Sequence, residues 1–368
     1  FVVKGAPERF KTMKEIAFAA YNKAIPGLEP GLEAVSYYDP PNMTYPFGAY
    51  ICVMEIDVDD GDGMVDESQF AALGVAGRFY VGSSRGIQVY AFPSGEFIER
   101  LGRNGSGPGE FRSGGSMFVD QTGRLHMLDS RQRRQTAFDS SHRLAFVRAL
   151  PPGPTFEAVM IGVGGDSLLL NSHLSDADRF AEPLHIWDGT QVAASFGVPR
   201  DSVFAATDPY MRRQIALVGQ KHVLAIAPST YDGAIYSLDG DLRLRFTRPD
   251  LWSRPASGLM TPPASFDEPM YGYVQDVKVD EQNLAWVIAW EPHPDWRDRG
   301  EVREFPGGER FVVQKRDAKS LHVARIDVID LGAGALVATQ RSDLLIWGFV
   351  GDGYVYGYEY DDEGAPTL

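Results

Sequence analysis

The stretch LGRNGSGPGEFRSGGSMFVDQTGRLHMLDSRQRRQTAFD, residues 101–139, decides the fold of this chain. It opens on a glycine-rich loop, in which a nucleotide-triphosphatase motif would need Lys and then Ser or Thr after the last glycine. Here Gly109 is followed by Glu110 and Phe111. A dinucleotide fingerprint would need a helix next, but the residues after the loop predict two short strands around a turn. The loop is therefore predicted to be a structural turn built on Gly102, Gly105, Gly107, Pro108 and Gly109.

A turn followed by a β-rich apolar strand recurs along the whole chain. A short apolar run precedes each copy, and two more strand-like segments follow each of the first five copies. Tandem four-stranded antiparallel units are typical of a β-propeller, whose blades are set radially around a channel. We therefore predict an all-β, six-bladed β-propeller of four-stranded blades. The copies begin at Gly77, Gly123, Gly165, Gly219, Asn283 and Gly353.

The sixth unit runs out of chain near its third strand, in the closing segment DDEGAPTL, residues 361–368. An unassigned strand-like segment, AYICVMEIDV at residues 49–58, precedes the first unit. Pairing it with the last unit would close the ring and cover open strand edges. We predict that the strand at 49–58 completes the sixth blade, and that the glycine-rich loop crosses from the outer rim of one blade to the channel side of the next.

Residues 101–139 resemble the NHL-type six-bladed propellers of bacteria, in which a G-x-G-P-G-E-F loop leads into an aspartate-turn-glycine strand pair and then an arginine-containing strand. The likeness is looser at residues 277–290, 325–338 and 351–361. It implies the fold and often an extracytoplasmic location. Such propellers serve as binding platforms, partner scaffolds and occasionally lyases or lactonases, so the fold does not choose a function. The resemblance also favours Asp129 and Arg134 as a structural pair of the blade framework.

The first 46 residues match no blade, and we treat 1–46 as an N-terminal extension and 47–368 as the propeller. Apolar residues at helical spacing predict one amphipathic helix over about residues 8–24, followed by a proline-rich connector. The apolar face of this helix could pack on the propeller's own flank or dock on a partner. For the second alternative the candidate contact residues are Phe10, Met13 and Tyr21.

A long insertion, residues 291–320, interrupts the fifth unit. Loops of this length tend to be functional or disordered. Aromatic side chains are costly to leave in water, so we expect the insertion to fold back or to meet a partner. The candidate partner-binding residues here are Trp296, Phe305 and Phe311.

Chemical motifs are few. The acidic segment at residues 57–67 resembles a calcium loop, with Asp57, Asp59 and Asp62 as weak metal candidates. Its register fails, because Asp60 is an extra residue and the twelfth-position Glu is absent, so a solvated acidic turn is favoured. The seven histidines show no H-x-H spacing, and no G-x-S-x-G nucleophile elbow occurs. We therefore predict no catalytic residues and no cofactor.

The charge and composition exclude some partners. Fifty acidic residues against 35 basic ones give a formal charge of −15, which repels the phosphate backbone of nucleic acids. A single cysteine, Cys52, rules out an intramolecular disulfide. No apolar run reaches the roughly 18 residues of a membrane span. The chain starts at Phe1, which leaves open a preceding signal peptide, lipid anchor or membrane helix.

These observations predict a non-catalytic protein-interaction or scaffold propeller, such as an accessory extracytoplasmic subunit of a larger assembly that could be membrane-bound. The alternative is a metal-dependent hydrolase or lyase, or a small-ligand-binding propeller, acting at the central channel.

Overall fold

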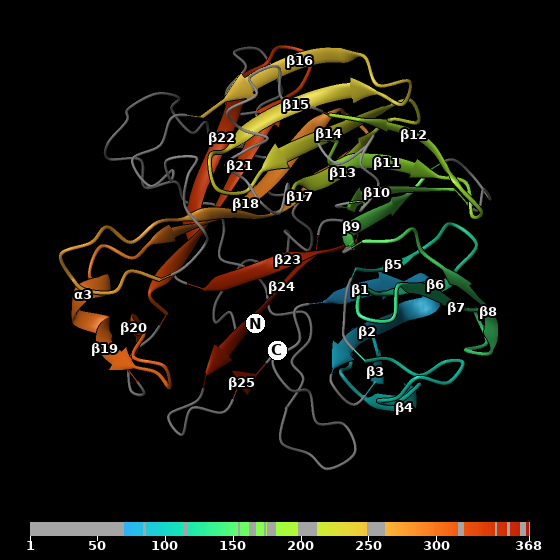
Figure 1. Cartoon of the computed structure of the whole chain (residues 1–368), viewed down its shortest axis with the longest axis horizontal. Coiled ribbons are helices and arrows are strands. Elements are labelled where there is room, and N and C mark those ends of the chain that lie inside the picture. The colour runs from blue at the N-terminus through green and yellow to red at the C-terminus, as the bar shows by residue number, and fades with distance from the viewer. Residues whose placement is uncertain are drawn as a thin grey trace, which may run out of the picture.

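The computed structural model is an all-β protein in which successive antiparallel sheets follow one another around a ring (Figure 1). Within the described part of the chain, no helix has the length and apolar character needed to cross a membrane. The structure describes residues 70–83, 86–112, 116–153, 155–161, 167–172, 174, 182–197, 212–248, 262–315, 320–342, 344–351, 354–360 and 366–367.

Five of the sheets are four-stranded blades. Blade 1 holds β1 (Ala71–Gly74), β2 (Arg78–Ser83), β3 (Gly86–Ala91) and β4 (Phe97–Leu101), with a short 3-10 helix, η2 (Val75–Gly77), between its first two strands. Blade 2 holds β5 (Met117–Val119), β6 (Leu125–Asp129), β7 (Arg134–Phe138) and β8 (Leu144–Ala149). Blade 3 holds β9 (Thr155–Met160), β10 (Leu168–Ser172), β11 (Leu184–Trp187) and β12 (Val192–Phe196). Blade 4 holds β13 (Gln214–Val218), β14 (His222–Ala227), β15 (Asp232–Ser237) and β16 (Leu242–Thr247). Blade 5 holds β17 (Tyr273–Val279), β18 (Leu284–Pro292), β21 (His322–Asp330) and β22 (Ala335–Ser342).

The predicted propeller class is confirmed, but the prediction of six four-stranded blades is wrong: the described residues form five. The last unit is a three-stranded sheet of β23 (Leu345–Gly351), β24 (Tyr354–Tyr360) and β25 (Pro366–Thr367). Only Glu359 and Tyr360 of β24 pair with β25. One of the two β25 residues is Pro366, which has no N–H to donate, and this limits the ladder between β24 and β25. The segment 49–58, predicted to complete this unit, lies outside the described residues.

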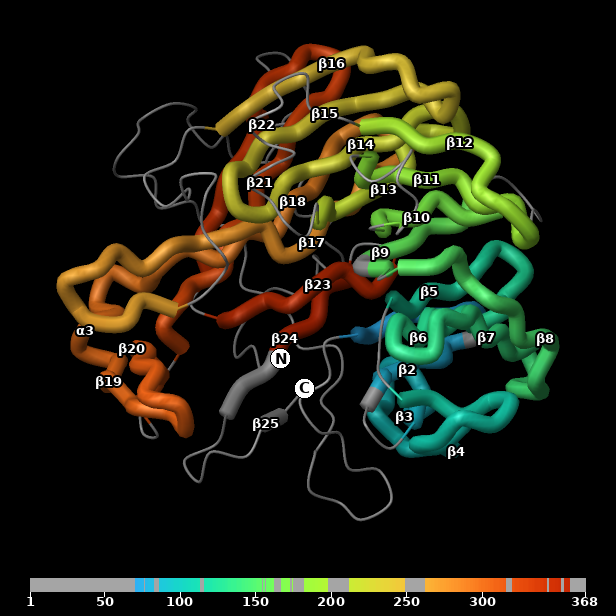
Figure 2. The backbone as a smooth tube through the Cα atoms, viewed as in Figure 1, coloured from blue at the N-terminus to red at the C-terminus, as the bar shows by residue number. Residues whose placement is uncertain are grey.

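The first strand of each sheet surrounds the middle of the ring. Strand β1 lies against β5, β13 against both β9 and β17, and β17 against β23. Strand β1 also lies against β23, so the first and last sheets of the chain are neighbours (Figure 2). The ring is closed by this contact between sheets.

The second strand of a blade is buried on both faces, because neighbouring blades cover it. All of β6 and all of β10 are buried, and Leu168, Leu169 and Leu170 have no exposed surface. Such strands are rich in apolar residues, with a few buried polar ones, whereas the outer strands β8 and β16 largely alternate between exposed and half-buried residues. Six apolar clusters fill the spaces between successive sheets around the ring. Burial of each large side chain in them contributes roughly 1.5–3 kcal/mol.

The glycine-rich loop joins β4 of blade 1 to β5 of blade 2. Gly102 and Gly109 have positive φ angles of 68° and 74°. A side chain of the loop fills its interior, since Oε2 of Glu110 accepts a hydrogen bond of 2.6 Å from the Gly107 N–H. The same carboxylate forms a 2.7 Å ion pair with Arg103, and these contacts hold the pKa of Glu110 below its usual value. The loop is therefore a structural turn whose interior is occupied by its own Glu110 side chain.

Arg134 fastens this loop to blade 2 from the start of β7. Its guanidinium donates hydrogen bonds to the carbonyl oxygens of Ser106 at 2.9 Å and Gly107 at 2.7 Å, and also to that of Glu110. Asp129 has other partners: its Oδ2 accepts a hydrogen bond of 2.7 Å from the Arg112 N–H. Asp129 and Arg134 are direct partners in the β6–β7 ladder, and each side chain also binds the loop, so the expected structural pair of the blade framework is confirmed.

Candidate functional site

Two acidic side chains on inner strands are the unusual feature of the ring's middle. Glu157 lies on β9 and Asp276 on β17, and both are half-buried. Oε2 of Glu157 accepts a hydrogen bond of 3.1 Å from the Ile215 N–H on β13. Oδ2 of Asp276 accepts one of 2.7 Å from the Phe349 N–H on β23. Each carboxyl group therefore links its own sheet to the backbone of the next sheet.

Strand irregularities place Asp276 in this position. The pairing of β17 with β18 shifts between Val274 and Asp276, and that of β23 with β24 shifts between Ile346 and Gly348. Such bulges redirect side chains and free backbone N–H groups. A Cβ at Gly348 would lie 2.9 Å from Oδ2 of Asp276, so the glycine makes room for the carboxyl group.

The surroundings make both groups weaker acids than usual. Burial raises the pKa of Asp276 to about 6, against the opposing effect of the N–H groups of Phe349 and Val277 and the charge of Lys278. Burial, and next the negative charge of Asp276, raise the pKa of Glu157 well above its ordinary value, and Arg212 opposes the shift. With a pKa of about 6, Asp276 can take up or release a proton close to neutral pH, as acid–base groups do.

Arg212 and Tyr273 complete this channel cluster, which we define as Glu157, Asp276, Arg212 and Tyr273. The charge of Arg212 acts on both Glu157 and Tyr273. Burial is the larger influence on Tyr273 and raises its pKa, while its ring packs 5.3 Å from that of Trp290 between centroids. The cluster thus combines two carboxyl groups, one cation and one phenol.

Sequence reasoning missed the channel cluster. Asp276 lies in the short apolar run that precedes the copy at Asn283, and Glu157 lies directly before the run that precedes the copy at Gly165. Neither acidic residue was singled out. The available signal was an acidic residue within or directly beside an apolar run that was predicted to be an inner strand.

Metal binding gains no support within the described residues. They contain no group of three or more His, Cys, Asp or Glu side chains arranged to hold an ion. The two channel carboxyl groups alone fall short of the six to eight oxygen ligands typical of Ca²⁺. The predicted calcium candidates Asp57, Asp59 and Asp62 lie outside the described residues, so they stay predictions.

The insertion of blade 5 forms a projecting arm, which we define as residues 296–314. It contains α3 (Trp296–Arg299), β19 (Gly300–Glu304) and β20 (Arg310–Gln314), and it extends away from the blades at the left of Figure 1. Trp296 is only 5% exposed and packs with Met270, Val312 and Leu321 in a small core of its own. Arg297 covers the indole, with its Cζ 4.4 Å from the ring centroid. The base of the arm is therefore anchored.

The tip of the arm is exposed along its whole length, from residue 303 to residue 310. Phe305 is 37% exposed and its ring centroid lies 5.8 Å from that of the half-buried Phe311. Of the three predicted partner-binding residues in the insertion, these two face the surroundings and Trp296 does not. Their contact with a partner stays a prediction.

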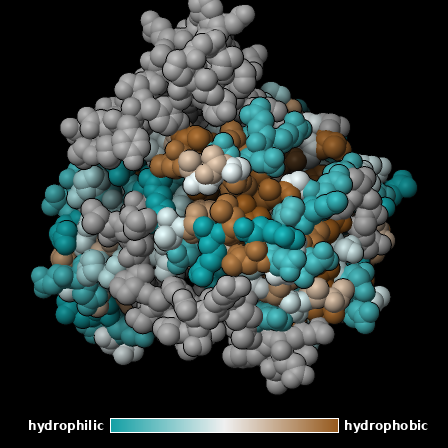
Figure 3. All heavy atoms as spheres, turned by 90° about the horizontal axis from the view of Figure 1, so that it is seen from above, coloured by the Kyte–Doolittle hydropathy of each residue, from teal (hydrophilic) through white to brown (hydrophobic). Residues whose placement is uncertain are grey.

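The outer strands contribute further apolar surface. From above, apolar residues gather in the middle of the visible face and hydrophilic residues border them (Figure 3). Leu242 on β16 is 37% exposed and Leu336 on β22 is 43% exposed. The propeller thus carries large apolar side chains on its outer strands as well as on its arm.

The N-terminal predictions remain untested. The expected helix with Phe10, Met13 and Tyr21, and the boundary between 1–46 and 47–368, lie outside the described residues.

Comparison with known proteins separates the chain into two parts. Residues 1–72 match a family model described as a molybdopterin cofactor-binding domain. The carbon monoxide dehydrogenase large chain of Afipia carboxidovorans is 75% identical over 61 residues, which are 17% of this chain and 8% of that protein. The large chain of Hydrogenophaga pseudoflava is 60% identical over 65 residues, 18% of this chain and again 8% of the relative. The match therefore spans under a tenth of these curated relatives.

Solved structures resemble the chain over most of its length. A "Putative exported protein" of Bacteroides fragilis has a TM-score of 0.51 at 15% identity, covering 83% of this chain and 82% of that one. A member of the duf4221 family from Bacteroides vulgatus has a TM-score of 0.54 at 8% identity, covering 85% and 94%. At these identities the likeness concerns the fold alone. None of the comparisons confirms the NHL resemblance.

The family match ends at the start of blade 1. Its last residue is residue 72, and β1 begins at Ala71. Of the matched residues the structure describes only 70–72, so it places no residue that could be tested as a ligand of the cofactor. The prediction of no cofactor came from motifs alone, and it did not anticipate this N-terminal similarity.

Proposed function

We propose that this chain is a protein-interaction propeller that works within a multi-subunit assembly related to carbon monoxide dehydrogenase. The observation that carries the proposal is the arm of blade 5, an anchored hairpin with a partly exposed aromatic pair near its tip. Support for the assembly comes from the N-terminal similarity.

Contact with a partner would stabilise the arm, because its hairpin and its partly exposed aromatic rings are energetically unfavourable in water. A two-stranded hairpin is marginal in water by itself, and here the small core around Trp296 supports it. Leaving Phe305 and Phe311 partly in water forgoes a share of the roughly 1.5–3 kcal/mol that full burial of a phenylalanine contributes. Aromatic side chains in such positions are typical centres of binding energy in protein interfaces.

Charge on the arm favours a protein surface of mixed polarity. Arg303 forms an ion pair with Glu301 at 2.5 Å, and the exposed Arg310 lies opposite Glu304 in the hairpin. An apolar pair surrounded by charges of both signs resembles the centre and rim of a protein interface.

For the N-terminal segment, we propose that it places the propeller beside a molybdopterin-containing catalytic subunit. The short match carries over neither the activity nor the subunit composition of the relatives, so the propeller itself is assigned no catalytic step. An extracytoplasmic location, on an assembly that could be membrane-bound, is part of the same proposal.

The test is gentle extraction from the native source, followed by native mass determination. A complex that contains this chain together with molybdenum supports the proposal, whereas a chain that runs alone at 40.6 kDa without molybdenum contradicts it. The double substitution Phe305→Ser and Phe311→Ser should release the partner. The matched control is Leu242→Ser, since Leu242 and Phe305 are both 37% exposed. Equal release by the control would count against the arm.

The channel cluster favours a second candidate, acid–base chemistry or small-ligand binding at the central channel. Glu157 and Asp276 supply the carboxyl groups, and Arg212 supplies a cation for an anionic substrate. The alternative is a purely structural role, in which both carboxyl groups only link neighbouring sheets. Asp276→Asn keeps an acceptor for the Phe349 N–H, so retained folding with lost ligand binding would favour the second candidate.

A further inference from the structure

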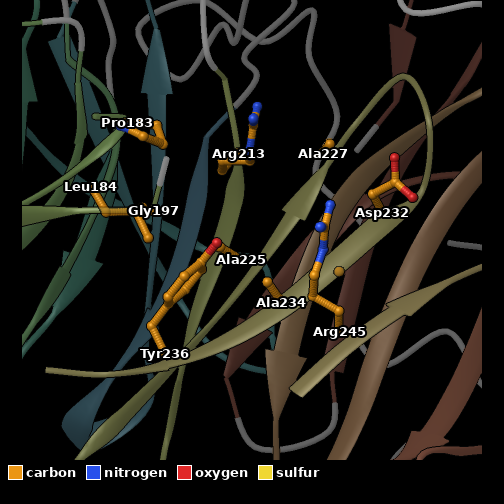
Figure 4. Close-up of a pocket in the computed structure, with 11 residues that line it drawn as sticks. Pro183, Leu184, Gly197, Arg213, Ala225, Ala227, Asp232, Ala234, Tyr236 and Arg245 are labelled. Carbon is orange, nitrogen blue, oxygen red and sulfur yellow. The ribbon is translucent and has the colours of Figure 1, made fainter. Parts of the chain in front are cut away.

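A pocket lies between blades 3 and 4 (Figure 4). It is on the face of blade 4 opposite the one that packs against blade 5. The hollow is partly open, and its empty space together with the adjoining solvent amounts to about 490 Å³. Its lining comes from β11 and the residues next to β11 and β12 on one side, and from β14, β15, β16 and the residue before β13 on the other. The lining residues are Pro183, Leu184, Gly197, Arg213, Ala225, Ala227, Asp232, Gly233, Ala234, Tyr236 and Arg245.

Small side chains create the hollow. Ala225 pairs with Ala234, and Ala227 pairs with Asp232, so alanines on adjacent strands lie side by side in the sheet. The same interface holds larger residues, among them Val223 of β14 and Leu184 of β11, and Leu184 also lines the pocket. Beside them the alanines form an apolar floor, in which Ala225 and Ala227 are buried and Ala234 is half-buried.

Two arginines and a tyrosine surround this floor. Arg245 pairs with Ala234 in the ladder, and Tyr236 follows two residues after Ala234 on the same strand. Figure 4 shows the side chains of Arg213, Tyr236 and Arg245 around one hollow, with both guanidinium groups directed toward the same end of the strands. Burial raises the pKa of Tyr236 and the charges of both arginines lower it, so the two cations act on one phenol.

The charge of the pocket is positive in an acidic protein. Its lining contains two arginines and one aspartate, while the chain has a formal charge of −15. Arg245 is exposed and makes no ion pair within the described part of the chain, not even with Asp232. Nη1 of Arg213 donates a hydrogen bond of 2.7 Å to the carbonyl oxygen of Arg212, which helps to orient the guanidinium group.

We propose that this pocket binds a small organic carboxylate with an apolar body. The carboxylate is held by Arg213 and Arg245, whose planar guanidinium groups match its geometry, and the Tyr236 hydroxyl donates a further hydrogen bond. The apolar body lies on the floor of Ala225 and Ala234. This inference does not depend on the proposed function, because the pocket lies on blades 3 and 4 and the arm belongs to blade 5.

Benzoate and its uncharged counterpart benzamide are the probes, titrated calorimetrically into the full chain up to millimolar concentrations. We expect benzoate to bind and benzamide to bind at least about tenfold more weakly, because charge-assisted hydrogen bonds contribute on this scale. Absence of benzoate binding, or equal binding of the two probes, overturns the proposal.

Three substitutions localise the site. Arg245→Gln should weaken benzoate binding about tenfold or more, and Ala234→Leu should abolish it by filling the hollow. The matched control is Arg243→Gln, an exposed arginine of the same strand that pairs with Asp241 at 3.1 Å and does not line the pocket. Benzoate binding that survives Arg245→Gln, or falls equally in the control, contradicts the assignment. Arg245 is exposed, so its variant should fold, and a thermal melt of each variant verifies this.

Discussion

The hydroxyl of Tyr231 donates a hydrogen bond of 2.9 Å to Oδ2 of Asp327, across the boundary between blades 4 and 5. Tyr231 belongs to the turn between β14 and β15 and has a positive φ of 56°, while Asp327 is fully buried on β21. Arg325 and Arg248 form ion pairs with the same carboxylate oxygen at 3.1 and 2.6 Å. The other oxygen accepts a hydrogen bond of 2.5 Å from Thr339. A buried charge with this set of partners stabilises one arrangement of the two blades.

Tyr231→Phe should lower the free energy of unfolding by roughly 1.5–3 kcal/mol, because it removes a buried hydrogen bond to a charged group. Chemical denaturation measures the change. Tyr354→Phe is the control, since Tyr354 is half-buried and packs its ring against Phe92 without donating a described hydrogen bond. An equal loss in both variants would show that the Tyr231–Asp327 bond contributes nothing specific.

Asp327→Ala should destabilise the protein more, by about 3–5 kcal/mol, because it leaves the buried Arg325 without a counter-charge at that position. Arg325 retains its ion pair with Glu291, which limits the loss. Denaturation of the double variant Tyr231→Phe, Asp327→Ala should show less than the sum of the two single losses, as expected for one network. Strict additivity would contradict the coupling.

The glycine-rich loop allows conformational strain to be separated from steric clash. At Gly102, with a φ of 68°, an added Cβ would lie 2.4 Å from the Gly109 carbonyl oxygen. At Gly109, with a φ of 74°, it would meet nothing within 4 Å. Gly109→Ala should therefore cost about 1–2 kcal/mol for the left-handed backbone alone, and Gly102→Ala should cost more. Thermal melts rank the variants, and a Gly109→Ala protein less stable than Gly102→Ala would contradict the geometry.

The channel carboxyl groups predict a pH dependence of stability. Asp276 has a pKa of about 6 in the folded chain, against an ordinary value of 3.8 for an aspartate in the unfolded chain, so the folded chain binds the proton more tightly. Its contribution to stability is fully present below pH 3.8 and is lost as the pH rises through about 6. At about 1.4 kcal/mol per pH unit this amounts to at most about 3 kcal/mol. Asp276→Asn should flatten urea-unfolding stability between these pH values, and an unchanged slope would contradict the shift.

Asp188 provides the contrast of opposite sign. Hydrogen bonds from Gln191 and Thr190 lower its pKa to about 2, so its contribution is present above pH 3.8 and lost as the pH falls through about 2. Asp188→Asn should therefore change the acid limb of the stability profile and leave the region near pH 6 unaltered. A change near pH 6 in this variant would show that the profile does not report Asp276.

Trp296→Ala should loosen the arm while leaving the ring folded. The indole is the largest member of its small core, and removing a buried tryptophan costs about 3–5 kcal/mol. Limited trypsin digestion should then cut at the exposed Arg303 and Arg310 before the blades unfold. In the control Phe305→Ala, a partly exposed ring is lost, and the cleavage rate should stay near that of the unchanged protein. Global unfolding in Trp296→Ala would show that the arm core is part of the ring.

The repeating pattern along the chain was enough to predict strands, turns and the propeller class. Runs such as Leu168–Leu170 are apolar throughout because neighbouring blades cover both faces of the blade. The pattern therefore lies in consecutive residues of one strand and can be seen in the sequence. The glycine-rich loop was predictable for a similar reason, since positive φ angles and the absent Lys are local properties. The number of four-stranded blades was not, because it depends on which segment pairs with β24, and that is a tertiary property.

The sequence by itself thus determined the local elements: strand periodicity, turn glycines and the exposed insertion. Only the tertiary structure decided which distant residues meet. Tyr231 and Asp327 lie 96 residues apart in the chain, and Glu157 and Asp276 influence each other from different blades. The pocket likewise needs β11 and β12 to face the alanines of blade 4. Such contacts follow from the ring geometry that packs one blade on the next, and no periodicity within a strand specifies that geometry.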